Sequence, residues 1–112
     1  MRAGICTLKC KVVHIRCEVA WLSKAGVRGI CLGPFILFAM SAEDVPQCLF
    51  RHELEHHYQQ LRDGRVWFHL KYIYWSLRHG YTNNPYEVEA RAKANNPLTT
   101  SEEQALWKLR EN

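Results

Sequence analysis

The sequence contains no hydrophobic run long enough to cross a lipid bilayer. Its longest apolar stretch, residues 29–40, is interrupted by Gly33-Pro34, and it is shorter than the roughly 20 residues that a membrane-spanning helix needs. The start of the chain also lacks a basic segment followed by an apolar one and a cleavage site, which is the pattern of a secretory signal. These absences predict a cytoplasmic protein that has no membrane partner.

Cysteines at the spacing of a metal or redox motif are also missing. An odd number of cysteines cannot all pair within one chain, and none of the five stands in a CxxC. They are Cys6, Cys10, Cys17, Cys31 and Cys48. We expect buried free thiols in a reducing compartment. A metal or redox cluster of the first three is the alternative, although their spacing does not support it.

Acidic residues are scarce in the first third of the chain. Up to residue 42, Glu18 is the single acid against six lysines and arginines, and the whole chain carries a net charge of +4. A basic segment can bind nucleic acid. These cations are scattered singly, however, as on the solvent face of a strand. We therefore expect that nucleic acid is not a partner.

Length and composition predict a single folded domain. The chain has 112 residues, of which 47% are apolar and 23% charged, and this balance excludes disorder. We see no repeat, linker or low-complexity segment that would divide it. One domain over residues 1–112 is the prediction.

Alternating apolar and polar residues predict strands in the first forty residues. The alternation runs from Cys6 to Trp21, with a slip after Val12 that indicates a bulge or a turn between two strands. Residues 27–32 and 35–39 form two further short apolar strands, separated by a glycine-proline break. This part of the chain is expected to be mainly sheet.

From about residue 41 the apolar residues recur with helical spacing. We predict a long helix that starts at a cap on Ser41 or Asp44 and ends near Asp63, where Gly64 stops it. Pro46 is tolerated in its first turn. One stripe of this helix is expected to face the core and consists of Phe50, Leu54, Tyr58 and Leu61.

A second helix is predicted over residues 65–79, and two shorter helices begin at Asn84-Pro85 and near Thr99. We expect the second helix to bury an apolar stripe in the core. This stripe consists of Val66, Leu70, Ile73 and Leu77. The whole pattern predicts an α+β fold, in which a small N-terminal β-sheet packs against the long helix and further C-terminal helices follow.

The long helix carries HExxH over residues 52–56, the motif that indicates chemistry. His52 and His56 are four residues apart, so both imidazoles project from one helical face and can reach one cation. Beside them, Glu53 can accept a proton from metal-bound water. A shuffled sequence of this composition contains HExxH in about one case in forty. The same residues spell the inverted motif HxxEH, with Glu55 as the base, but too little chain follows for its distant third ligand.

Two imidazoles and a water leave one protein ligand to be found. Glu87 is the favoured candidate, because an αα turn can bring its helix back against the HExxH helix. Ala90 and Ala94 lie on the same face, and their small side chains allow close approach. The alternative role of Glu87 is position N3 of a capping box with Asn84. The other candidate ligands are Glu89, His69, His79 and the Glu102-Glu103 pair.

The segment HELEHHYQQ, with NPYEVEA placing Glu87 31 residues after His56, resembles the gluzincin class of zinc metallopeptidases. The likeness is closest to minimal single-domain members, which share HExxHxxQ and a later ExEA segment, and it covers about residues 35–95. In that class a small sheet precedes the HExxH helix, and its edge strand binds extended peptide. Some members carry Asp at the position that Arg91 occupies here, so no role of that Asp is carried over.

The resemblance implies a zincin-like minimal domain that binds Zn²⁺ through His52, His56 and Glu87. It gives Glu53 the role of general base and makes residues 35–39 the edge strand. The partner that it implies is a peptide or protein substrate.

The sequence therefore predicts a zinc metallopeptidase that hydrolyses peptide bonds with a zinc-activated water and Glu53 as the base. Gln59 lies on the metal side of the helix and is expected to support a ligand or to bind substrate. The candidates for stabilising the oxyanion are Tyr81, Tyr86 and His79. The alternative functions are a metallopeptidase-like binding or structural module with little or no turnover, and another zinc hydrolase such as a deformylase or an amidase.

Overall fold

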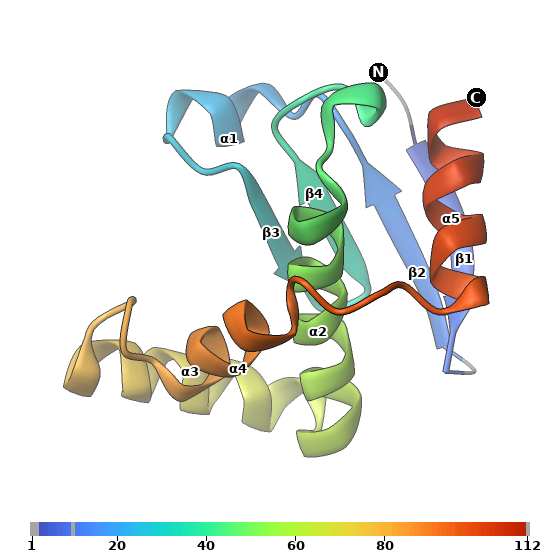
Figure 1. Cartoon of the computed structure of the whole chain (residues 1–112). Helices are drawn as coiled ribbons and strands as arrows, with labels where there is room; N and C mark the ends of the chain where they lie inside the picture. Colours follow the sequence, from blue (N-terminus) through green and yellow to red (C-terminus); the bar gives the residue numbers. More distant parts are fainter. Residues whose placement is uncertain (1–2, 10, 112) are drawn as a thin grey trace.

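The computed structural model describes residues 3–9 and 11–111 of the chain, so Cys10 and any cluster that includes it lie outside the described residues. Its N-terminal part forms a four-stranded sheet, and helices make up most of the remainder (Figure 1). The strands are β1 (Ala3–Leu8), β2 (Lys11–Arg16), β3 (Gly29–Leu32) and β4 (Phe35–Phe38). The helices are α1 (Ala20–Lys24), the 3₁₀ helix η1 (Ala42–Asp44), α2 (Gln47–Asp63), α3 (Arg65–His79), α4 (Pro85–Lys93) and α5 (Thr100–Glu111). The α+β class predicted from the sequence is confirmed at this level.

The sheet has the strand order β1-β2-β4-β3, which makes β3 an edge strand. β1 and β2 form an antiparallel hairpin, β2 and β4 are parallel, and β3 pairs antiparallel with β4. The prediction that residues 35–39 form the edge strand is therefore wrong. After β2 the chain passes through α1 to the edge strand β3 and then turns back along β4. β4 is therefore inserted between β2 and β3.

The long strand predicted up to Trp21 is also wrong in its second half. β2 ends at Arg16, Glu18 takes a positive φ of 57°, and α1 begins at Ala20. Cys17 and Val19 are still buried, so the alternation of burial continues where strand pairing has stopped. The period of two predicted burial correctly as far as Val19, but Trp21 is 55% exposed. Beyond β2, the backbone nitrogens of Glu18 and Val19 still donate to the carbonyl oxygens of Met40 and Phe38.

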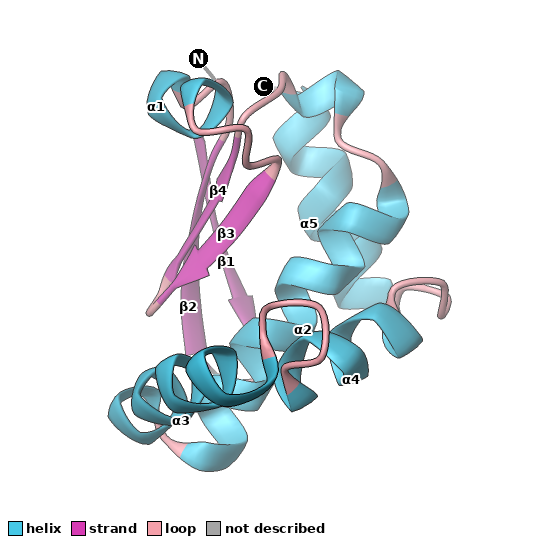
Figure 2. Cartoon of the chain, turned by 90° about the vertical axis from the view of Figure 1, so that its left-hand side faces the viewer, coloured by secondary structure: helices cyan, strands magenta, loops and turns pink. Residues whose placement is uncertain are grey.

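The hydrophobic core lies between one face of the sheet and α2. Val13, Ile15, Ile36 and Phe38 point inward from the strands, and Phe50 of α2 stacks on Phe38 with ring centroids 6.2 Å apart. α5 packs beside β1 on the same side of the sheet as α2 (Figure 2). The sheet thus presents a rigid apolar surface on which the long helix is fixed.

The start of α2 differs from the prediction. Ser41 precedes η1, while Pro46 is the residue before the first turn of α2, so neither predicted cap begins the long helix. Its end at Asp63 agrees with the prediction, because Gly64 adopts a φ of 87° that ends the helix. The bounds of α3 also agree with the prediction.

The face of α3 that was predicted to be buried is not the buried one. The stripe of Val66, Leu70, Ile73 and Leu77 is exposed to solvent. The opposite side of the helix packs inward with aromatic side chains, of which Phe68 is buried and stacks on Tyr86 of α4 with centroids 4.5 Å apart. Within residues 3–9 and 11–111, no helix is both long and apolar enough to cross a membrane.

Candidate metal centre

Helix α2 places two imidazoles next to each other. His52 and His56 are one turn apart, and their ring centroids are separated by 5.0 Å with the planes nearly perpendicular. His56 is buried and His52 is largely buried, because both lie on the side of α2 that faces α3 and α4 rather than the sheet. The local cause is the i, i+4 spacing of a regular helix.

Helix α4 brings a carboxylate to the same point. Glu87 Oε1 lies 3.0 Å from Nε2 of His52, and Glu87 Oε2 lies 3.3 Å from Nε2 of His56. Two ligands at about 2.1 Å from a tetrahedral cation are about 3.4 Å apart. The three donor groups all lie within 4.8 Å of one another and could therefore hold a metal ion.

The charges in this cluster favour an ionised carboxylate and a protonated imidazole when no cation is bound. Burial opposes the ionisation of Glu87, but the hydrogen bonds from His52 and His56 outweigh it and hold the pKa of Glu87 well below its usual range. Burial likewise disfavours the charged form of His56, yet the contact with Glu87 raises the pKa of His56. A divalent cation would replace that proton.

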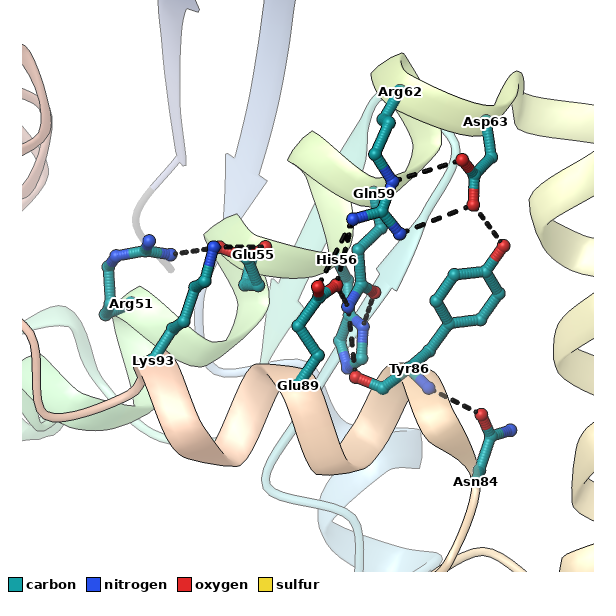
Figure 3. A network of polar contacts seen from close by, with 10 residues as sticks. All are labelled: Arg51, Glu55, His56, Gln59, Arg62, Asp63, Asn84, Tyr86, Glu89 and Lys93. Atoms are coloured by element: carbon teal, nitrogen blue, oxygen red, sulfur yellow. Dashed lines mark hydrogen bonds and ion pairs between the residues drawn. The ribbon is translucent and has the colours of Figure 1, made fainter.

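Gln59 orients His56. Its amide nitrogen donates to the carbonyl oxygen of Tyr86 at 3.0 Å and to Glu89 Oε1 at 2.8 Å, so its oxygen faces the imidazole. His56 Nδ1 donates to that oxygen at 2.9 Å (Figure 3). Because Nδ1 carries the hydrogen in this bond, Nε2 is the atom left to bind a metal.

Polar contacts join α2 to both ends of α4 (Figure 3). Near the start of α4 the Tyr86 hydroxyl donates to Asp63 at 2.5 Å, and in the middle of the helix Glu89 pairs with Arg62 at 3.2 Å. Near the end of α4, Nζ of Lys93 lies 3.8 Å from Oε2 of Glu55. These contacts hold the helix that carries Glu87 against the helix that carries the two imidazoles.

Glu53 is buried and lines a cavity of about 680 Å³ between β3, α2 and α3. The same cavity is lined by His52, His56 and Glu87. Burial raises the pKa of Glu53, while the two imidazoles oppose that effect. A carboxylate with a raised pKa beside a metal position is suited to accept a proton.

The edge strand β3 runs directly past this carboxylate. A Cβ atom on Gly29 would lie 3.2 Å from the Phe38 ring and 3.4 Å from Cγ of Glu53. The residue at the start of β3 must therefore be small for the strand to pass this close to Glu53.

Comparisons with family models, with curated proteins and with solved structures found no match to this chain. Among the described residues, His52, His56 and Glu87 form the one group of three or more that could hold a metal ion.

The other candidate ligands lie elsewhere. Glu89 bonds to Gln59 and Arg62, and Glu102 bonds to the Tyr58 hydroxyl and closes a capping box with Thr99. His69 lines the cavity outside the cluster, whereas His79 and Glu103 are exposed.

Glu87 does not form the capping box that the sequence allowed. Asn84 Oδ1 accepts from the backbone nitrogen of Tyr86 at 2.9 Å, and the Glu87 carboxylate turns toward the imidazoles instead. Arg91 occupies the position at which some members of the class that the sequence resembles carry Asp. Its side chain donates to the carbonyl oxygen of Thr82 and so fixes the loop before α4.

Of the three candidates for stabilising an oxyanion, Tyr81 lines the cavity. The hydroxyl of Tyr86 is occupied by Asp63, and His79 is outside the cavity lining. Sequence reasoning missed Tyr72, whose hydroxyl donates to Glu87 Oε2 at 2.5 Å. The signal that could have found Tyr72 is its i, i+4 spacing from Phe68 on the aromatic side of α3.

The cysteines described are all free thiols. Cys31 of β3 is buried and accepts a hydrogen bond from the amide of Gln60 at 3.3 Å. Burial raises the pKa of the Cys31 thiol, which makes it a poor thiolate ligand or nucleophile.

Proposed function

We propose that this chain is a small zinc-dependent peptidase built as a minimal zincin-like domain. The observation that carries the proposal is the Glu87 carboxylate of α4, which faces the Nε2 atoms of His52 and His56 at 3.0 and 3.3 Å. Glu53, buried in the same cavity, supports a hydrolytic role for this site rather than a structural one, since structural zinc sites are closed by four protein ligands.

In this proposal the residues divide the chemistry between them. Zinc held by the three ligands would supply a water of lowered pKa and polarise the scissile carbonyl. The Glu53 carboxylate accepts the proton of the attacking water and delivers it to the leaving amine. Tyr81, at the cavity wall, donates a hydrogen bond to the carbonyl oxygen as it gains negative charge.

The substrate that this arrangement favours is an extended peptide. β3 has an unpaired edge among the described strands, and its residues line the cavity that holds Glu53. A peptide added along this edge would gain main-chain hydrogen bonds, as in other strand-addition complexes. In this proposal β3 takes the edge-strand role that the resemblance implied for residues 35–39.

The test is Glu53→Gln with Glu55→Gln as its matched control. Glu53→Gln should retain one zinc per chain and lose peptide cleavage by at least about a hundredfold, as expected for removal of a general base. Glu55 pairs with Arg51 at 2.9 Å and points away from His56. In Glu55→Gln the contacts of Tyr86 with Asp63 and of Arg62 with Glu89 still join α2 to α4, so this variant should keep both zinc and activity. Zinc content is measured by atomic absorption and cleavage with a quenched-fluorescent peptide library.

Three results would contradict the proposal. A Glu53→Gln protein as active as the wild type would exclude Glu53 as the base, and a chain purified with ample zinc but containing none would exclude the metal site. A wild-type chain that binds one zinc tightly yet cleaves no library peptide would instead indicate a binding module.

A further inference from the structure

Helix α3 exposes its aliphatic face. Four side chains that recur at helical spacing lie within about 60° of one another on the helical wheel. They are Val66, Leu70, Ile73 and Leu77, which are 75%, 52%, 58% and 85% exposed. The inward side of α3 is filled by aromatic rings instead. An apolar stripe of this length on the surface indicates an interaction site.

The border of this stripe carries side chains of a second kind. Trp67 and Tyr74, both exposed, lie along one side of it, and Lys71 and Arg78 fall within about 60° of them on the wheel. Residues 64–86 include no Asp or Glu. The order from the centre of the stripe outward is therefore aliphatic, amphipathic aromatic and cationic, which is the order found in helices that lie in a membrane interface.

We propose that α3 binds the surface of a lipid bilayer that contains anionic lipid. The helix lies along the interface with its aliphatic stripe in the headgroup and upper acyl region, while Lys71 and Arg78 contact lipid phosphates and carboxylates. Such a helix does not span the bilayer. The proposal therefore agrees with the absence of a spanning helix among the described residues, although it replaces our expectation that no membrane is a partner.

Charge complementarity favours lipid over a second copy of the chain. In two copies joined through this stripe, each α3 would add Lys71 and Arg78 beside the contact but no acidic residue, since none lies between 64 and 86. An anionic membrane supplies that missing charge. The inference is independent of the proposed peptidase function, because none of the four stripe residues lines the cavity.

Vesicle flotation with the full chain tests the proposal. The wild type should bind vesicles of phosphatidylcholine mixed with phosphatidylserine, bind phosphatidylcholine alone more weakly, and dissociate as salt is raised. Replacing two stripe residues, Ile73→Glu with Leu77→Glu, should lower the partition coefficient at least tenfold, a conservative estimate for losing two buried aliphatic side chains. The matched control is Trp107→Glu, which alters an apolar side chain on α5 that is 68% exposed and should leave binding unchanged.

A second variant separates charge from apolar burial. Arg78→Gln should weaken binding to the anionic vesicles about fivefold and leave binding to neutral vesicles unchanged. Binding should also shift the tryptophan emission to the blue, and Trp67→Phe should reduce that shift.

The proposal is overturned if the wild type does not float with anionic vesicles at low salt, or if the Ile73→Glu, Leu77→Glu protein floats as well as the wild type. It is also overturned if sedimentation equilibrium shows a dimer that this double substitution separates, since the stripe would then be covered by a second copy.

Discussion

Replacing Gln59 with Leu tests whether a residue that does not bind the metal controls zinc affinity by orienting His56. The Gln59 side chain is fully buried, accepts a hydrogen bond from Nδ1 of His56 and ties that ring to α4. Leu has nearly the same volume but neither the side-chain oxygen nor the amide nitrogen of Gln59. The Nδ1 hydrogen of His56 then has no partner, and nothing fixes Nε2 as the atom that faces Glu87.

The expected magnitudes follow from these contacts. A buried donor left without a partner costs about 1–3 kcal/mol of the free energy of unfolding. The Tyr86 carbonyl and the Glu89 carboxylate keep other partners, in the helix and at Arg62, so they add little. Zinc affinity should fall about 10- to 100-fold, as it does when a ligand loses the group that orients it.

Gln60→Leu is the matched control. Gln60 is the neighbouring residue and is also fully buried, but its amide contacts Cys31 and Arg65 and does not reach His56. Both variants should therefore unfold at lower urea concentration than the wild type, whereas Gln59→Leu alone should bind zinc more weakly in competition with a chromophoric chelator. Equal losses of zinc affinity in both variants, or no loss in Gln59→Leu, would refute the reasoning.

The site and the core allow three more predictions. The contact with Glu87 raises the pKa of His56 in the zinc-free site, so below that pKa zinc must displace a proton and the apparent affinity should fall by up to about tenfold per pH unit. Calorimetry in buffers of different ionisation enthalpy should detect a proton release that grows as the pH falls, and a release that does not grow would contradict the raised pKa. Phe50→Ala should lower the free energy of unfolding by about 3–5 kcal/mol in urea titrations, because the ring is fully buried against Phe38; a loss below about 1 kcal/mol would show that the core collapses around the gap. Gly29→Ala should reduce cleavage while zinc content stays at the wild-type value, because the added Cβ would contact Phe38 and Glu53. Unchanged cleavage would mean that β3 shifts to make room for the Cβ without moving Glu53.

The parts of the fold that the sequence predicted well are those that depend on neighbouring residues. The end of α2 and both ends of α3 follow from glycines that take a positive φ. The proximity of His52 and His56 follows from the geometry of one helix. Glu87 could be placed beside them because the loop between α3 and α4 is short and the small Ala90 allows the helices to approach, so local signals sufficed.

The errors concern relations between elements. α3 has apolar side chains on two sides, one aliphatic and one aromatic, and its sequence alone does not indicate which of them meets the rest of the chain. The aromatic side is inward because Phe68 and Tyr72 pack around His56, with ring centroids 6.1 and 6.2 Å from it. The position of β4 inside the sheet likewise depends on the crossover through α1, for which the alternating pattern carries no information.

The contacts around Glu87 also explain how the donor groups can be assembled without a metal. In small zinc domains whose ligands lie on flexible loops, the metal itself provides much of the folding free energy. Here α4 is already joined to α2 through Tyr86 and Asp63 at one end and Lys93 and Glu55 at the other. Glu87 receives a further hydrogen bond from Tyr72 of α3. Zinc would therefore bind to a site that the protein has organised beforehand, and little of its binding free energy would be spent on ordering the chain.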